Sequence, residues 1–129
     1  MSAPLLALVI AVSGGVGAGL RFTIDQAMRG VRVRLRFPLP VLIINASGCF
    51  VMAFLVGGFG GTTADFPPSL LAIEAGLLGG FTTFSTVSTD TAEMWHEKRY
   101  GAAIANAGGT LVVCLGAAIA GMTLAAAMR

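Results

Sequence analysis

The chain has 129 residues, of which 56% are hydrophobic and only 11% are charged, and its mean hydropathy is +0.87. A soluble domain carries about 25% charged residues, so this chain has too little charge to cover a water-facing surface. The composition excludes an ordinary soluble domain and predicts one polytopic membrane domain over residues 1–129. We expect this domain to lie in the lipid bilayer and not to bind nucleic acid.

The first apolar segment, residues 4–20, is close to the length that a membrane-spanning helix needs. It ends at Arg21, and Asp25 and four further arginines follow it. A signal peptide would need basic residues before the apolar run and a small-residue cleavage site after it. Because nothing basic precedes this run, we interpret residues 4–20 as a spanning helix.

Three more apolar segments follow, at residues 39–59, 69–95 and 100–128. Pro38 and Pro40 stand where the second segment begins, a position that tolerates proline because the first helical amides have no intrahelical partner. A short polar loop, residues 60–68, precedes the third segment. The sequence therefore predicts an all-α membrane protein with four transmembrane helices.

The third segment has an unusual middle, Gly79-Gly80-Phe81-Thr82-Thr83-Phe84-Ser85-Thr86. Glycine weakens a helix by ~1 kcal/mol relative to alanine, and irregular backbone at membrane depth occurs only where it is buried in protein or lines a cavity. One interpretation is a helix broken at mid-membrane, with carbonyls and amides available to ions. The other is a continuous helix whose hydroxyls bond to its own carbonyls.

Glycines at small-xxx-small spacing predict close approach between helices. Gly15 and Gly19 form such a pair in the first segment, and Gly57 and Gly61 form one at the end of the second.

Polar residues within spans are costly and are therefore functional candidates. Asn45 is the candidate in the second segment. Asn106, Thr110 and Cys114 follow one another at i, i+4 and i+8, which places them on one helix face. Such a stripe could conduct a dehydrating anion, or it could bond neighbouring helices together. Glu74 lies near the start of the third segment, where an interfacial charge is the favoured interpretation.

The sequence lacks the residues that several other classes of function require. Cys49 and Cys114 lie in apolar runs and form neither a CxxC motif nor a His/Cys cluster, so they indicate packing rather than zinc binding. The sequence contains no recognisable nucleophile–base pair, which argues against an enzyme. A small proton-coupled transporter would place a carboxylate in the first helix, and residues 4–20 contain none.

The third-segment motif, Gly79 to Thr86, resembles the signature of the Fluc (CrcB-type) fluoride channels. Three further stretches resemble the same family in the same order along the chain: Gly14-Gly15-Val16-Gly17-Ala18-Gly19-Leu20-Arg21, Asn45-Ala46-Ser47-Gly48-Cys49-Phe50 and Lys98-Arg99-Tyr100-Gly101. The resemblance implies a passive fluoride channel in the plasma membrane or cell inner membrane that exports fluoride and relieves its toxicity.

The resemblance also implies an antiparallel dimer with two pores and a structural sodium ion (Na+) at the dimer interface. The sodium ligands would be the backbone carbonyls of Gly79 and Thr82. The implied pore-lining residues are Asn45, Thr83, Phe84, Ser85, Asn106, Thr110 and Cys114. The resemblance also implies that Arg21 and Asp90 either line a vestibule of the pore or contribute to packing.

Two positions depart from the family pattern. Val87 stands where the family has a second pore phenylalanine, and Val41 stands where it usually has a hydroxyl residue. These departures leave open a second interpretation, a non-conducting or partly conducting subunit of a heteromeric channel.

Basic residues are distributed unevenly, and they mark cytoplasmic loops. Seven lie in or beside the loops after the first and third segments: Arg21, Arg29, Arg32, Arg34, Arg36, Lys98 and Arg99. The opposite side has Arg129 alone, so we expect both termini to face outward. Such a chain inserts in one orientation, whereas the resemblance implies an inverted neighbour. The second subunit is therefore either an identical chain or a related paralogue of opposite charge bias, and the sequence leaves both open.

Overall fold

The computed structural model describes the backbone of residues 1–129 and every side chain except that of Thr63. All regular structure in these residues is helical: α1 (Ala3–Ala27), α2 (Arg29–Leu35), α3 (Leu39–Gly58), η1 (Thr63–Asp65), α4 (Pro68–Phe81), α5 (Ser85–His96) and α6 (Tyr100–Ala127). Four segments are long and apolar enough to cross a membrane, namely α1, α3, α6 and the stretch Pro68–His96 that contains α4 and α5. The predicted all-helical architecture with four candidate spans is confirmed.

The first helix is longer than residues 4–20. α1 continues through Arg21 and Asp25 to Ala27, and the arginine-rich stretch after it forms α2 instead of a loop. Charged residues do not end a helix as glycine or proline does, so the end of the apolar run is not the end of the helix. α2 is followed by Arg36 in the left-handed conformation, at φ 50°.

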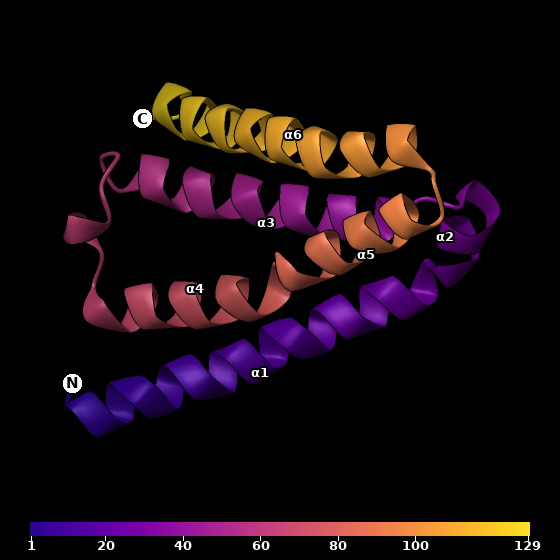
Figure 1. Ribbon diagram of the computed structural model, residues 1–129. Coiled ribbons are helices and arrows are strands. Elements are labelled where there is room, and N and C mark those ends of the chain that lie inside the picture. Colours follow the sequence, from indigo (N-terminus) through magenta and orange to yellow (C-terminus); the bar gives the residue numbers. More distant parts are fainter.

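The helices form two side-by-side pairs. α1 runs along α4, and α3 runs along α6, while α5 leaves the line of α4 and packs beside α6 (Figure 1). Both termini and η1 lie at one end of the bundle, and α2 and the α5–α6 turn lie at the other (Figure 1). The junction between α4 and α5 therefore lies between the two ends.

Glycines allow α1 and α4 to approach closely. These glycines are not the pair that the small-xxx-small spacing had indicated. A Cβ on Gly17 would overlap the backbone of α4, and a Cβ on Gly80 would overlap the backbone of α1. Gly15 and Gly19 have open space beside them within the described residues, so this pair does not form the contact between α1 and α4. The spacing motif is shared by several faces of one helix, and only packing selects the face that meets the partner.

The contact between α3 and α6 also rests on glycine. A Cβ on Gly57 would crowd Met122 and Ala125, and a Cβ on Gly121 would overlap the backbone of α3. Gly57 was predicted correctly. Gly61 lies beyond α3 with φ +87° and contributes to the turn instead.

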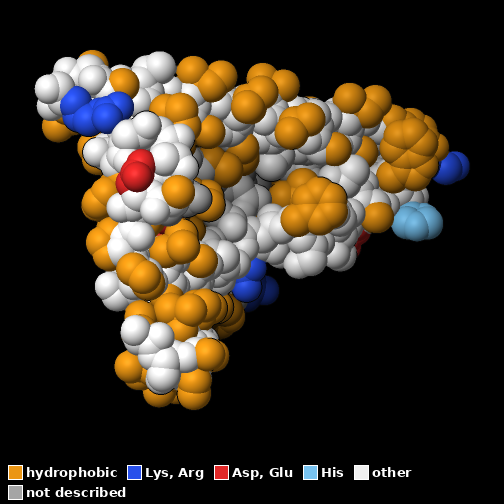
Figure 2. Space-filling view, turned by 90° about the vertical axis from the view of Figure 1, so that its left-hand side faces the viewer, with side chains coloured by type: hydrophobic (Ala, Val, Ile, Leu, Met, Phe, Trp, Pro, Cys, Tyr) orange, Lys and Arg blue, Asp and Glu red, His pale blue; other side chains and the backbone are white. Residues whose placement is uncertain are grey.

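The outer surface is largely apolar. Seen from the end that carries the termini, two arms meet at an angle, and hydrophobic side chains are spread over both arms with few charged side chains among them (Figure 2). Large side chains such as Leu115, Val112 and Ile104 are more than half exposed. Exposed apolar side chains around a helical bundle are what a lipid environment requires.

Candidate functional site

Two buried hydrogen bonds hold the junction between α4 and α5. Asn45 on α3 donates from Nδ2 to the Thr83 carbonyl at 2.9 Å, and the Thr83 N–H donates to Asn45 Oδ1 at 2.8 Å. Both residues are buried. In a continuous helix, the Thr83 N–H and carbonyl would bond to other backbone groups. Here the Asn45 amide replaces those partners, so both Thr83 groups are hydrogen-bonded although the backbone is not helical.

The same pairing changes the surroundings of the Gly79 carbonyl. In a continuous α-helix this carbonyl would accept from the N–H of residue 83, which here donates to Asn45. α4 ends at Phe81, Thr82 has an extended backbone at φ −80° and ψ 155°, and α5 begins at Ser85. The structure therefore shows an interrupted helix rather than a continuous one.

The Thr83 hydroxyl group caps the start of α5. Its Oγ1 accepts from the Thr86 N–H at 3.2 Å, donates to Thr86 Oγ1 at 3.1 Å and lies 3.2 Å from Ser85 Oγ. A hydroxyl that satisfies a free amide in the first turn stabilises a helix start. Ser85 itself is exposed.

A hollow of 540 Å³ opens beside this junction; its lining is mostly apolar, and we call it the polar hollow after the amide and hydroxyl groups that interrupt that lining. Residues of α3, α4, α5 and α6 line it together with the junction itself. The predicted site residues among them are Asn45, Gly79, Thr82, Thr83, Phe84, Thr110 and Cys114. The structure thus brings together on one surface most of the residues that the sequence singled out, from segments far apart in the chain.

Phe84 projects from the junction with 84% of its side chain exposed. It lines the polar hollow and also a neighbouring hollow of 440 Å³ that continues along α5. Val87 lines both hollows as well, but it is buried. The ring of Phe84 therefore stands where the two hollows meet.

The polar stripe of α6 divides in the structure. Thr110 and Cys114 line the polar hollow. Asn106 is only 2% exposed and donates from Nδ2 to Thr91 Oγ1 at 2.9 Å and to the Val87 carbonyl at 3.3 Å, both on α5. Asn106 is therefore not part of the lining, and its amide joins α6 to α5.

Glu74 also lines the polar hollow. The sequence favoured an interfacial charge at this position, but the side chain is buried on α4. No alternation or motif around Glu74 indicates this orientation, because α4 is apolar on several faces.

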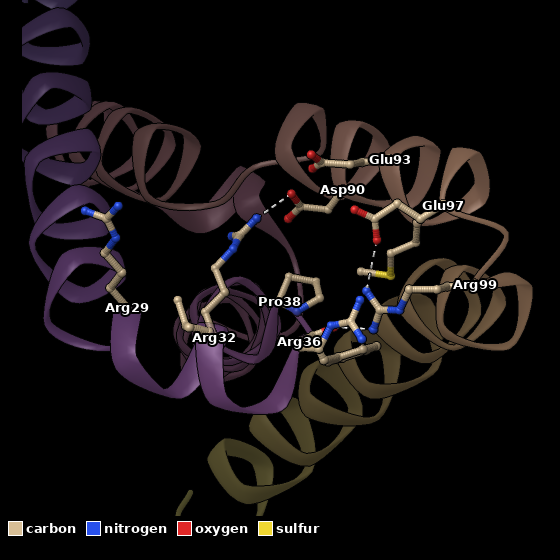
Figure 3. Close-up of a pocket in the computed structure, with 11 residues that line it drawn as sticks. Arg29, Arg32, Arg36, Pro38, Asp90, Glu93, Glu97 and Arg99 are labelled. Carbon is tan, nitrogen blue, oxygen red and sulfur yellow. Dashed lines mark hydrogen bonds and ion pairs between the residues drawn. The ribbon is translucent and has the colours of Figure 1, made fainter.

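A second, charged hollow of 410 Å³, which we call the arginine hollow, lies at the end of the bundle that carries α2. Asp90 on α5 is buried and accepts from Arg32 Nη2 at 2.5 Å, so α2 is tied to α5 (Figure 3). Arg99 donates to the Arg36 carbonyl (Figure 3). The resemblance had singled out Asp90 but not Arg32. Arg21, which the resemblance also assigned to a vestibule or to packing, does not line this hollow.

Comparison with known proteins places the chain among membrane proteins of one family. The family model described as "CrcB-like protein, Camphor Resistance (CrcB)" matches residues 8–122. The chain belongs to this family. With four apolar helices, it is a multi-pass membrane protein, which in bacteria resides in the plasma membrane.

Curated relatives support the same assignment over nearly their whole length. The protein named "Fluoride-specific ion channel FluC 1" from Leifsonia xyli subsp. xyli is 36% identical over 125 residues, which cover 94% of this chain and 87% of the relative. "Fluoride-specific ion channel FluC" from Renibacterium salmoninarum is 35% identical over 127 residues, which cover 95% of this chain and 100% of the relative. "Fluoride-specific ion channel FluC 2" from Mycolicibacterium paratuberculosis is 38% identical over 116 residues, which cover 90% of each chain. These relatives are named as channels and not as enzymes.

Proposed function

We propose that this chain is a passive fluoride channel that exports fluoride across the plasma membrane and relieves its toxicity. The family membership and the names of the relatives support fluoride as the transported ion. The single observation that carries the proposal is the pairing of Asn45 with the Thr83 backbone. It interrupts a spanning segment beside a hollow that has neutral hydrogen-bond donors and an exposed phenylalanine.

The chemistry of the polar hollow suits a small, strongly hydrated anion. Stripping water from fluoride without replacement costs tens of kcal/mol by Born reasoning, and a pore must substitute donors that also release the ion. The Thr110 hydroxyl is such a neutral donor. The edge of an aromatic ring carries positive partial charge, so Phe84 can face fluoride without the full countercharge that would trap it.

The interruption belongs at mid-membrane in this proposal. The segment Pro68–His96 is 29 residues long, and the junction after Phe81 lies near its centre. Polar backbone at that depth is tolerated where it lines a cavity. The remaining implied pore residues, Ser85 and Asn106, flank the lining and stay predictions.

A sodium ion and an inverted second subunit complete the proposed channel. The carbonyls of Gly79 and Thr82 would hold the ion, since carbonyl oxygens suit a hard cation. Both residues line one hollow, and the helical donor for the Gly79 carbonyl is diverted to Asn45. When bound, the ion would join the two subunits and take no part in permeation. Replacement of sodium by a large cation during purification should then weaken the dimer.

The second subunit is an identical chain or a paralogue with opposite charge bias. The asymmetry of basic residues favours the paralogue, because this chain inserts with α2 inside and both termini outside. Val87 favours it too, since a partner could supply an aromatic ring where this chain has a buried aliphatic side chain. Cysteine labelling that finds residues 60–68 accessible only from the cytoplasm would overturn this orientation.

Fluoride efflux from liposomes, followed with a fluoride electrode, tests the function directly. Vesicles that contain the purified protein should release fluoride and retain chloride, whereas protein-free vesicles should retain both. Efflux from the chain alone would also establish that a paralogue is not required. Absence of efflux, both alone and with an inverted paralogue, would overturn the proposed function.

A further inference from the structure

Glu74 is a buried acid in the wall of the polar hollow. It is 4% exposed, and among the described residues its Oε1 atom is buried without a hydrogen-bond partner. Among the described side chains that line this hollow, Glu74 is the only acidic one, and none of them is basic. Buried carboxylates are normally paired with a cation or with several donors, so an ionised Glu74 would need compensation from elsewhere.

The neighbouring elements supply no cationic side chain to Glu74. Cys49 on α3 and Cys114 on α6 are the other titratable groups that line the hollow. α1, which packs along α4, has no ionisable side chain before Arg21. The charged residues Asp65 and Arg129 lie beside Gly60 and not in this lining. A mobile proton or cation must therefore compensate any charge on Glu74.

An ionised Glu74 would oppose fluoride in the same hollow. Two like charges repel much more strongly in a low-dielectric site than in water. A protonated carboxyl group has no charge, and its O–H is a neutral donor of the kind that Thr110 provides. The two protonation states thus have opposite effects on an anion.

We propose that Glu74 is a proton-binding residue of the fluoride path, which conducts when the carboxyl group is protonated and is blocked when it is ionised. The inference rests on the proposed function, because it takes the polar hollow as part of that path. Fluoride export then increases as the solution bathing the hollow becomes acidic.

Fluoride efflux measured at several pH values tests the inference in wild-type protein and in Glu74→Gln. The leak from protein-free vesicles at each pH is subtracted, because hydrogen fluoride crosses bilayers. Between about pH 5 and pH 8, wild-type flux should rise as pH falls, by up to ~tenfold per pH unit for one titrating group. Glu74→Gln, which has a neutral side chain of the same shape, should conduct at high rate with little pH dependence.

Two further variants isolate the carboxyl group. Glu74→Asp keeps an acid and should keep a pH response. Asp65→Asn removes an acid that lies outside both hollows and should keep the wild-type profile. Identical pH profiles for wild type and Glu74→Gln would overturn the inference. So would wild-type flux that follows sodium concentration and not pH, because a cation would then be the compensating charge.

Infrared difference spectra between acidic and alkaline samples provide a readout that does not depend on flux. The wild-type spectrum should contain a carbonyl band of a protonated carboxylic acid that is missing from the Glu74→Gln spectrum, in which only the bands of the other five acidic side chains remain. Absence of this difference would count against a proton on Glu74 even if both proteins conduct. Absence of flux at every pH in both proteins would instead overturn the proposed function, and this inference with it.

Discussion

The polar hollow and the arginine hollow are both suited to anions, but by different chemistry. The polar hollow has a mostly apolar lining that contains an amide, hydroxyls, thiols and one exposed aromatic ring, with Glu74 as its single acidic side chain among those described. The arginine hollow is lined by four arginines and three acids: Arg29, Arg32, Arg36, Arg99, Asp90, Glu93 and Glu97. The arginines of the second hollow therefore lie at the end of the bundle, whereas no described basic side chain lines the interior hollow.

This difference follows from the solvent that each hollow meets. At the water-facing end, arginines can attract an anion over about a Debye length and release it readily, because water screens the charge. In the interior, a cationic side chain in direct contact with fluoride would hold the ion too tightly for conduction. The comparison predicts that interior substitutions change flux, whereas substitutions in the arginine hollow change stability first.

The largest effect is expected for Asn45→Ala. Both Thr83 backbone groups lose their partner, and unsatisfied polar groups at membrane depth cost several kcal/mol each. Fluoride efflux should be abolished while size-exclusion chromatography still shows an assembled protein. Ser47→Ala is the matched control on α3, since the Ser47 hydroxyl bonds only to the Ile44 carbonyl of its own helix. Wild-type flux in Asn45→Ala would remove this amide from the mechanism.

The next largest effect is expected for Arg32→Ala in the arginine hollow, which should lower the stability of the fold. The change leaves Asp90 buried without its cation, and a broken buried ion pair costs about 3 kcal/mol. Arg32 is partly exposed, at 33% of its side chain, so the cost should lie at or below this figure. Thermal unfolding in detergent measures it. Arg34→Ala, which removes an exposed arginine outside the hollow, should unfold like wild type. If the two variants unfold alike, the ion pair does not hold α2 in place.

Much of this arrangement could be predicted from the sequence because it is local. Four apolar runs gave the spans, and the glycines and hydroxyls around Thr82 indicated an interruption as one of two possibilities. Asn45 was recognisable as a polar residue in a span. Its partner was not, because the Thr83 backbone lies 38 residues away and the pairing depends on how α3 packs.

Other features depended on packing that no spacing encodes. Asn106 shares a helix face with Thr110 by sequence, yet its amide turns to α5 and bonds there. Arg32 is one of four arginines in a short stretch, and only the fold brings it to Asp90. The burial of Glu74 likewise follows from the rotation of α4 within the bundle.

A smaller effect is expected for Phe84→Ile. The side chain is 84% exposed, so its replacement should leave the fold intact. The loss of one favourable edge contact, about 1.4 kcal/mol, corresponds to about tenfold slower flux. Phe22→Ile, at an exposed position on α1 away from the hollow, is the control. Equal flux in the two variants would show that the Phe84 ring does not face the ion.

The smallest effect is expected for Thr110→Val, which removes one hydroxyl donor from the polar hollow at nearly constant volume. A neutral hydrogen bond contributes about 1 kcal/mol net, so fluoride efflux should slow about fivefold. Thr123→Val is the matched control, because the Thr123 hydroxyl bonds to the Ile119 and Ala120 carbonyls of its own helix and lies outside the hollow. If Thr110→Val and Thr123→Val conduct equally, the α6 hydroxyl is not a donor to fluoride, and conduction in the hollow depends on Asn45 and Phe84.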